Sequence, residues 1–418
     1  MIGEIITIGN EIISGETQDL NAWYAAGRLT KAGLRIKRMT FVGDEPEMVA
    51  FVLRQAKGSS NFVIVTGGLG STDDDITNEI VALALERPLC IHEAMLEKIK
   101  KIAQKRNIPL TDSLLKMAYM PLGAQLMSEK GIVCGFYLIE DGVPFYFLPG
   151  IPEQMRYLLD NFVVTDIVNR FQVKDVRVYK LIRTYGLSEP EIAEAFRKKK
   201  SWEGAVIFGF YPQFPENHIT ITATGEDSRK VQEIVEEAQK EVLETLGKYV
   251  FSVDNEEMEQ VVGKLLKEKG LTLSTAESCT GGLVSHKLTN VAGSSEYYLG
   301  GVVAYSNYLK EKLLGVRSQT LRTFGAVSLE TVKEMAEGIR KITGSDLAVA
   351  ISGIAGPSGG TKEKPVGTVC LGFSSGDLTD ARVYRFFGSR IQVKQNSAAM
   401  ALDWIRRYIC GYPFLPGL

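Results

Sequence analysis

Histidine and cysteine are scarce in this chain. Three histidines in 418 residues leave little material for a histidine-rich metal site. The five cysteines show no CxxC spacing and no pairing along the chain: Cys90, Cys134, Cys279, Cys370 and Cys410. Scattered cysteines of this kind favour reduced thiols over a disulfide framework, which is typical of a cytoplasmic protein.

A strong net charge is also absent, as is any apolar run long enough to cross a bilayer. The formal charge is −2 and no basic stripe is present, so the sequence does not predict a positively charged surface that would bind nucleic acid. The start, MIGEIITIGNE, has no basic segment before an apolar one, so no signal peptide is expected. These absences predict a cytoplasmic protein with small-molecule partners, and neither nucleic acid nor a membrane as partner.

What is present is an alternation of short apolar runs with helical patterns, which predicts an α/β protein. The length favours two or three domains. Residues 1–165 predict a parallel sheet with helices on both faces, in three layers. Residues 175–250 predict a small central α/β domain without a recognisable chemical motif. A hinge near Asp254 leads to a third α/β domain over residues 255–418.

Ser295, Tyr305 and Lys310 are separated by ten and five residues in the third domain. A serine hydroxyl needs a base, and a lysine serves as one only where burial or positive potential keeps its amine neutral. The segment EYYLGGVVAY predicts a buried strand, and Ser306 is expected to cap a helix that carries Lys310 in or near its first turn. Tyr305 is expected to relay a proton or to hold the serine.

Two glycine-containing loops accompany this set. TAESCTGG, residues 275–282, precedes a predicted helix whose free N–H groups suit a phosphate, although Ser278 or Thr280 acting as a helix cap is the commoner use. ISGIAGPSGG, residues 351–360, lets the backbone approach a ligand closely. Arg390 is a candidate phosphate partner or a surface arginine. Cys279, seven residues before His286, is a rival nucleophile without an orienting group.

The first domain has its own glycine-rich loop, TGGLGSTDDDIT, directly after a predicted strand. It lacks the lysine of a Walker A loop. The aspartates Asp73, Asp74 and Asp75 are candidate ligands of a hard cation that bridges phosphates. The alternative is that one of them caps the next helix and the others favour its dipole.

Over residues 255–410, the motifs TAESCTGG, AGSS, AYSN, ISGIAGPSGG and KPVGTV resemble the CinA C-terminal, nicotinamide-nucleotide amidase domain. The resemblance implies hydrolysis of nicotinamide mononucleotide to nicotinate mononucleotide and ammonia without a cofactor, with Ser295 as nucleophile and Tyr305 and Lys310 as its activating partners. The expected substrate-binding residues lie in the two loops and at the last helix: Glu277, Ser278, Thr280, Gly281, Gly282, Ser352, Gly353, Gly356, Gly359 and Arg390.

Residues 1–165, with DLN, VGD, TGGLG, DDIT and LPGIP, resemble the MoaB and MogA molybdopterin-binding superfamily and the CinA N-terminal domain. This likeness implies an ADP-ribose pyrophosphatase that uses a divalent metal of the cobalt or magnesium class, with potassium as a candidate second ion. Asp74 and Asp75 are the expected metal ligands. The expected nucleotide-binding residues are Asn10, Glu11, Asp19, Asn21, Asp44, Gly67, Gly68, Gly70 and Thr77.

The chain departs from that second pattern at three places. Asn10 replaces a usual aspartate, Ser71 a usual proline, and KGIVCG, residues 130–135, a usual NGTAPG stretch. A neutral amide in place of a carboxylate weakens cation binding. The alternative hypothesis for the whole chain is therefore a nucleotide-sensing competence or damage-response protein whose first domain is inactive. A homodimer is expected from the resemblance alone.

Overall fold

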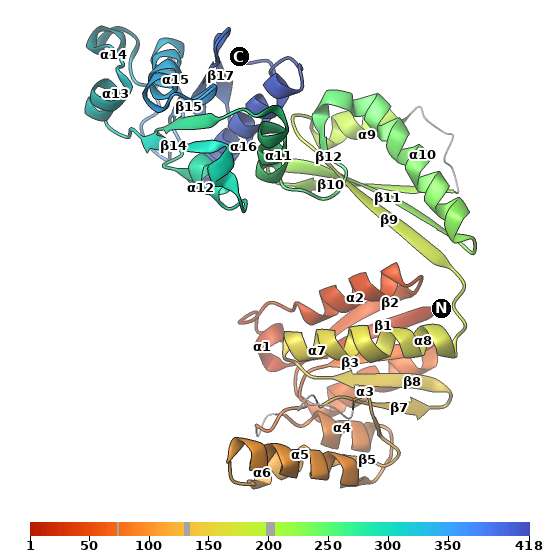
Figure 1. The fold of residues 1–418 in the computed structure, drawn as a ribbon. Coiled ribbons are helices and arrows are strands. Elements are labelled where there is room, and N and C mark those ends of the chain that lie inside the picture. The colour runs from red at the N-terminus through yellow and green to blue at the C-terminus, as the bar shows by residue number, and fades with distance from the viewer. Residues whose placement is uncertain (73–74, 129–133, 198–204) are drawn as a thin grey trace. The chain divides into compact units, whose positions relative to one another are not determined.

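The computed structural model describes residues 1–72, 75–128, 134–197 and 205–418. Asp73, Asp74 and the first four residues of the KGIVCG stretch lie outside these ranges. The chain forms two compact units, which are residues 1–178 with 223–233 and residues 179–222 with 234–418. Figure 1 shows α/β architecture in both units, as the alternating pattern predicts. None of the helices in the described ranges combines the length and apolar content that crossing a membrane requires.

The first domain is built on a six-stranded sheet with the order β2-β1-β3-β8-β7-β6. The pairs β1–β2, β1–β3 and β3–β8 are parallel, whereas β8–β7 and β7–β6 are antiparallel. The predicted parallel sheet is thus extended by an antiparallel edge. A separate hairpin pairs β4 with β5. The strands are β1 (Ile2–Ile8), β2 (Arg35–Val42), β3 (Phe62–Thr66), β4 (Leu89–Ile91), β5 (Tyr119–Pro121), β6 (Gln125–Leu126), β7 (Phe136–Glu140) and β8 (Val143–Leu148).

Helices cover both faces of this sheet, so the three-layer prediction is confirmed. Alternate strand residues point to opposite faces, and two apolar clusters follow from this. One cluster packs α2, α7 and α8 on one face, and the other packs α3, α4 and α5 on the opposite face. The helices are α1 (Asn10–Ile13), α2 (Asn21–Lys31), α3 (Pro46–Ser59), α4 (Thr77–Ala84), α5 (Glu93–Arg106), α6 (Asp112–Lys116), α7 (Pro152–Leu158) and α8 (Val164–Arg170).

The central segment forms a four-stranded sheet in the order β10-β11-β9-β12 with two helices. Its long helix α10 buries an apolar stripe that includes Val231, Val235, Ala238 and Val242, as its 3.6-residue periodicity predicts. The elements are β9 (Val176–Thr184), α9 (Glu189–Arg197), β10 (Ile207–Gln213), β11 (Glu216–Gly225), α10 (Ser228–Leu246) and β12 (Val250–Ser252).

The third domain has a five-stranded sheet in the order β14-β13-β15-β16-β17. Strand β13 runs parallel to both β14 and β15, whereas β16 and β17 are antiparallel additions. The chain therefore leaves β13 toward one side and later returns to its other side. Such a reversal opens a crevice at the carboxyl end of the first strand, where ligands bind in open α/β sheets. The strands are β13 (Leu273–Glu277), β14 (Tyr298–Val303), β15 (Leu347–Gly353), β16 (Thr368–Ser374) and β17 (Thr379–Arg385).

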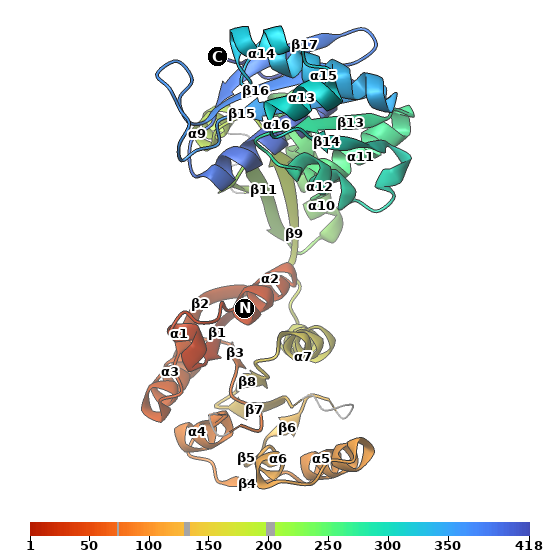
Figure 2. The same ribbon diagram turned by 90° about the vertical axis from the view of Figure 1, so that its left-hand side faces the viewer.

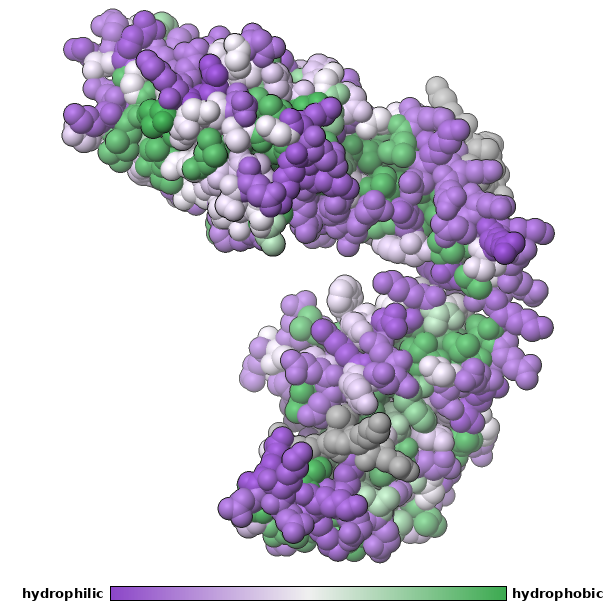
Figure 3. Space-filling view, viewed as in Figure 1, coloured by the Kyte–Doolittle hydropathy of each residue, from purple (hydrophilic) through white to green (hydrophobic). Residues whose placement is uncertain are grey.

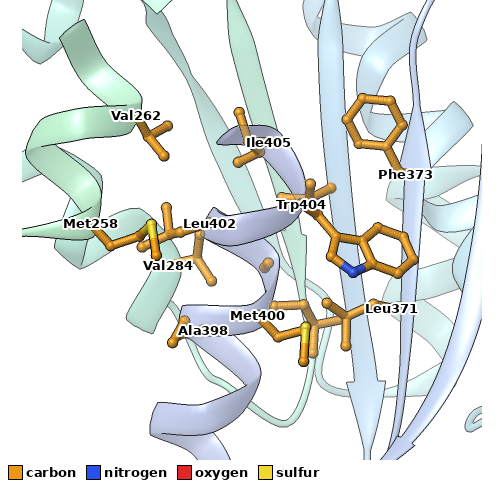
Figure 4. Close-up of a cluster of buried hydrophobic side chains, with 14 of the residues drawn as sticks. Met258, Val262, Val284, Leu371, Phe373, Ala398, Met400, Leu402, Trp404 and Ile405 are labelled. Atoms are coloured by element: carbon orange, nitrogen blue, oxygen red, sulfur yellow. The ribbon is translucent and has the colours of Figure 1, made fainter. Parts of the chain in front are cut away.

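Two groups of helices cover the third sheet. Helices α11, α12 and α16 pack on one face, and α13, α14 and α15 pack on the other; Figure 2 separates α11 and α12 from α14 and α15 in this way. The core under α16 centres on the buried side chain of Trp404, which Figure 4 shows beside Leu371 and Phe373 of β16. The helices are α11 (Met258–Lys269), α12 (Leu283–Thr289), α13 (Asn307–Leu314), α14 (Ser318–Phe324), α15 (Leu329–Thr343) and α16 (Arg390–Ile409).

Helix α16 also ties the third domain to the central segment. Asp403, Arg406 and Arg407 are all at most 3% exposed, and the Asp403 carboxylate accepts hydrogen bonds from both guanidinium groups. Arg406 donates further to the carbonyl oxygens of Lys248 at 2.7 Å and Val250 at 3.3 Å. The sequence predicts a separate central domain, whereas these buried charges join residues around β12 to α16 within one compact unit.

Strand β14 differs from its prediction. It lies at the edge of the sheet, and its side chains alternate between half-buried and exposed. Leu299 is 46% exposed and Val303 is 45% exposed. Figure 3 shows green, hydrophobic surface where Figure 1 places β14. An edge strand keeps one face in contact with a helix and the other in solvent, which explains why an apolar run is not buried here.

Candidate active site of the third domain

A cavity of about 200 Å³ opens at the carboxyl ends of the parallel strands. This is the position that the reversal of strand order at β13 favours. Its walls come from the segments after β13, β14 and β15, from the turn before α15 and from the start of α16. The lining residues are Ser278, Cys279, Tyr305, Asn307, Lys310, Ala326, Val327, Ser352, Gly353, Ala355 and Arg390.

Lys310 lies at the base of this cavity and is 1% exposed. Its Nζ donates to the carbonyl oxygens of Ala304 at 2.8 Å and Tyr305 at 3.4 Å, and it lies 3.1 Å from Ser278 Oγ. Burial lowers the pKa of the Lys310 ammonium. Helix α13, which carries Lys310, begins at Asn307 and is capped by the Ser306 hydroxyl, as predicted.

Burial without a carboxylate partner disfavours the charged form of Lys310 and lowers its pKa. A neutral amine has two N–H donors and one lone pair. In the neutral form the two carbonyl oxygens accept its two N–H groups and the lone pair faces the Ser278 hydroxyl, whereas in the charged form all three oxygens accept from Nζ. No carboxylate among the described residues forms an ion pair with Nζ. Lys310 is therefore placed to remove the proton of Ser278.

The structure places Ser278, and not Ser295, within hydrogen-bonding distance of Lys310. Ser295 is exposed on a short 3₁₀ turn, Ser294–Glu296, that precedes β14. Lys310 follows the opposite end of the same strand. Six residues of β-strand span roughly 20 Å. The fifteen residues from Ser295 to Lys310 include the whole of β14 and the start of α13, so the two side chains lie at opposite ends of that strand. Ser278 is the serine within hydrogen-bonding distance of the lysine.

Tyr305 has a different role from the one predicted. Its main-chain oxygen accepts from Lys310, but its side chain is 63% exposed and its hydroxyl accepts a hydrogen bond from Arg390 Nη2 at 3.2 Å. Arg390 also donates from Nη1 to the Gly356 carbonyl oxygen at 2.7 Å. Arg390 therefore lines the cavity, as predicted, and connects the segment after β14 with the glycine-rich loop after β15.

The predicted phosphate site at the start of α12 is occupied by the protein itself. The Glu277 carboxylate, 1% exposed, accepts from the N–H groups of Gly282, Val284 and Ser285. It also accepts from the Ser285 hydroxyl at 2.7 Å. Glu277 is thus the cap of α12, which corrects its assignment as a substrate-binding residue and the expectation that Ser278 or Thr280 caps this helix.

The other predicted binding residues of the two loops divide into two groups. Gly281 and Gly282 have left-handed backbones that form the turn into α12, and Thr280 is fully buried beside them. Ser352 lines the cavity, where its hydroxyl donates to the Ala326 carbonyl oxygen at 2.7 Å. Gly353 lines it directly, whereas Gly356 and Gly359 shape the loop beyond it with positive φ angles of 81° and 90°.

Cys279 lines the same cavity, yet its environment argues against nucleophilic use. Burial raises the pKa of the Cys279 thiol to about 12, so the thiolate that attacks carbonyl groups is not formed near neutral pH. His286 lies on α12 and contacts Asn290 through Nε2 at 3.3 Å. The position of Ser278 next to a neutral lysine makes the hydroxyl the better nucleophile.

The predicted site of the first domain gathers at the carboxyl edge of β1, β2 and β3. Asn10 Oδ1 accepts from the Asp44 N–H, and Asp44 Oδ2 accepts from the Asn10 N–H, both at 3.2 Å. Asp19 accepts from the Thr7 hydroxyl and from the Ala22 N–H. Asn21, 7% exposed, donates to the Gly150 carbonyl oxygen at 2.7 Å, and its own carbonyl oxygen is buried without a partner.

The glycine-rich loop follows β3 as predicted. Gly67 and Gly68 have φ angles of 107° and 64°, a conformation that side chains rarely adopt. The Thr77 hydroxyl donates to the Gly67 carbonyl oxygen at 3.1 Å. A Cβ at Gly70 would lie 2.3 Å from Asp75 Oδ2. Glu11 lies in the first turn of the short helix α1 and is exposed.

The metal prediction finds little support in this loop. The Asp75 carboxylate accepts from the Thr72 N–H at 2.9 Å and from its hydroxyl at 2.5 Å, so it closes its own turn. Asp74 lies outside the described residues. Within the described ranges, no three cysteine, histidine or carboxylate side chains converge as a metal site would require. The described donors therefore do not fit a divalent cation by themselves.

Comparison with known families fits this arrangement of three α/β domains, the last of which carries a serine–lysine cavity. Residues 4–169 match the probable molybdopterin binding domain, residues 179–252 the damage-inducible protein CinA KH domain, and residues 255–409 the CinA C-terminal domain. The chain is 38% identical over 403 residues to a CinA-like protein of Geotalea uraniireducens, with 96% of each chain covered.

A second relative is the putative competence-damage inducible protein of Caldanaerobacter subterraneus, which is 39% identical and is covered over 98% of this chain and 99% of its own. The chain belongs to the CinA family. Among solved structures, a competence or damage-inducible protein from Enterobacter asburiae matches at 38% identity with a TM-score of 0.36, covering 37% of this chain and 96% of its own.

Proposed function

We propose that the third domain hydrolyses the carboxamide of nicotinamide mononucleotide to nicotinate mononucleotide and ammonia, within pyridine nucleotide recycling. The observation that carries the proposal is the buried Lys310, whose Nζ lies 3.1 Å from Ser278 Oγ and whose pKa is lowered by burial. The substrate follows from the family resemblance of the motifs around the cavity. The chemistry uses only side chains of this domain and requires no cofactor.

The reaction would proceed through an acyl-enzyme. Ser278 Oγ attacks the carboxamide carbon as its proton moves to Lys310 Nζ. The C–N bond then breaks, and the lysine returns the proton to the departing nitrogen, which leaves as ammonia. A water molecule attacks the resulting ester, and its proton passes through Lys310 to Ser278. The N–H of Cys279, directly after the nucleophile in a cavity-lining loop, is the candidate donor to the developing oxyanion, in the manner of a strand-to-helix nucleophile turn.

Ammonia release from nicotinamide mononucleotide tests the proposal. Ser278→Ala is expected to reduce kcat to background, and Lys310→Arg likewise, because a guanidinium stays protonated in this pH range. Ser295→Ala is the matched control and is expected to retain activity. A Ser295→Ala protein without activity beside an active Ser278→Ala protein would return the nucleophile to Ser295. An active Lys310→Arg protein would show that the residue supplies charge only.

For the first domain we propose nucleotide binding at the carboxyl edge of β1–β3, with ADP-ribose as the candidate ligand. The buried carbonyl oxygen of Asn21, which has no hydrogen-bond partner among the described residues, supports this, since a buried acceptor without a partner is uncommon outside functional sites. ADP-ribose hydrolysis should be assayed with cobalt, magnesium and potassium ions and with Asp75→Asn. Hydrolysis that needs a metal and disappears in Asp75→Asn supports a pyrophosphatase. Binding without hydrolysis under every condition supports a nucleotide sensor.

A further inference from the structure

The cavity of the third domain offers the phosphate of a mononucleotide no partner at α12, because Glu277 already occupies that helix start. A buried carboxylate there repels a second anion. The phosphate partner must therefore come from another wall of the cavity. The start of α16 forms that wall through Arg390.

Arg390 and Lys394 are separated by four residues on α16 and so lie on the same side of the helix. Arg390 uses two of its five donors, toward Gly356 and Tyr305. Neither cation forms an ion pair with any of the described residues, and the first turn of α16 holds no acidic residue. Cations near a helix start are unfavourable for the helix. Two of them together without a counter-charge are better explained by an anionic ligand than by helix stability.

Lys394 reaches toward the loop that carries Ser278. A Cβ built at Gly281 would lie 3.7 Å from Lys394 Nζ, so the ammonium rests against the backbone three residues beyond Ser278. Between the two lies Thr280, whose hydroxyl oxygen is buried and has no hydrogen-bond partner among the described residues. Arg390 thus lines the cavity together with Ser278 and Lys310, and Lys394 lies against the loop that carries Ser278 and Thr280, close to that wall of the cavity.

We propose that Lys394, together with Arg390, binds the phosphate of the substrate and restricts the amidase to phosphorylated nucleosides. This inference rests on the proposed function for the identity of the substrate, and on the two cations for the phosphate. Lys394 is a specificity-determining residue: it acts on binding and leaves the chemistry at Ser278 unchanged.

The test compares nicotinamide mononucleotide with nicotinamide riboside, which differs only by the phosphate. In the full-length chain, Lys394→Gln is expected to raise KM for the mononucleotide about ten- to a hundred-fold, the range of a charge-assisted hydrogen bond, with kcat nearly unchanged. Its kcat/KM for the riboside should equal that of the unmodified protein. Lys394→Arg should largely restore the mononucleotide KM. Lys269→Gln, which removes an exposed charge from α11, is the control and should change neither substrate.

Calorimetric binding of ribose 5-phosphate separates this inference from the amidase proposal. If neither nicotinamide compound releases ammonia, but Lys394→Gln weakens ribose 5-phosphate binding, the amidase proposal fails and the phosphate site stands. Equal ribose 5-phosphate binding by the unmodified and Lys394→Gln proteins overturns the phosphate site. An equal loss of kcat/KM for both nicotinamide substrates also overturns it, because a merely structural change would affect both alike.

Discussion

At the scale of single residues, the chemistry of Lys310 depends on which hydrogens and lone pairs its neighbours can satisfy. Two carbonyl oxygens and one hydroxyl surround Nζ. A charged ammonium would place three donors there without a counter-ion, in a site that is 1% exposed, which burial makes unfavourable. The environment therefore disfavours the charged form and lowers the pKa of the amine.

This selection predicts how stability depends on pH. The pKa of Lys310 is lowered in the folded protein, whereas the unfolded lysine has a pKa of about 10.4. Between these two values the unfolded chain binds more protons, so the free energy of unfolding rises with pH. Urea unfolding at several pH values should show this rise in the unmodified protein relative to Lys310→Met. A relative fall with pH would mean that Lys310 is charged in the fold.

Lys310 and Arg390, which the sequence nominates as site residues, both line the cavity. It does not identify the partner of Lys310. Ser278 stands before a helix start and is naturally interpreted as a cap, while Ser295 matches by offset. The signal for Ser278 was its place directly after β13, at the reversal of the strand order, and that order requires knowledge of which strands pair.

At the scale of elements, α12 depends on one carboxylate. Glu277 is the last residue of β13, yet its side chain accepts four hydrogen bonds from the first turn of the following helix. A strand end and a helix start are thereby held in one fixed geometry. Ser278, the next residue, is positioned between them, so the cap also positions the proposed nucleophile.

Glu277→Ala should therefore destabilise the third domain by about 2 kcal/mol or more, because it removes a cap and leaves buried N–H groups without acceptors. Urea unfolding measures this loss. Glu268→Ala, at an exposed position of α11, should leave the free energy of unfolding within about 0.5 kcal/mol of the unmodified value. If the two variants are equally stable, the hydrogen bonds of Glu277 do not hold α12.

Sequence patterns predict most elements well where a buried stripe or a cap determines them, as with α10 and with Ser306 before α13. These patterns fail where the burial of a strand depends on its position in the sheet. The run from Tyr298 to Val303 is apolar enough for a central strand, but its place in the order puts it at the edge. Similarly, the TAESCTGG loop predicts a free helix start, and only the folded chain shows that Glu277 occupies it.

At the scale of the whole molecule, two compact units should unfold as two transitions. Asp403 is the only acidic partner that the described residues give to the buried Arg406 and Arg407. Asp403→Ala would leave two uncompensated buried charges, and breaking such a pair typically costs about 3–5 kcal/mol.

Differential scanning calorimetry of the full chain should therefore show one transition shifted to a lower temperature in Asp403→Ala. The transition of the first domain should remain in place, because the variant changes no contact there. A shift of both transitions would show that the units unfold together. Two unchanged transitions would show that the buried charges contribute nothing to stability.

Helix α16 has twenty residues and is about 30 Å long. Arg390 stands at one end, on the cavity wall, and Arg406 stands near the other, fastened to the backbone of residues 248 and 250. Because α16 is one continuous helix, a shift of its end near β12 would also move Arg390 at the other end. Selection on the geometry of the cavity would then extend to residues that do not line it. Changes around β12 should appear in evolution together with compensating changes on α16, even though the cavity lies at the far end of that helix.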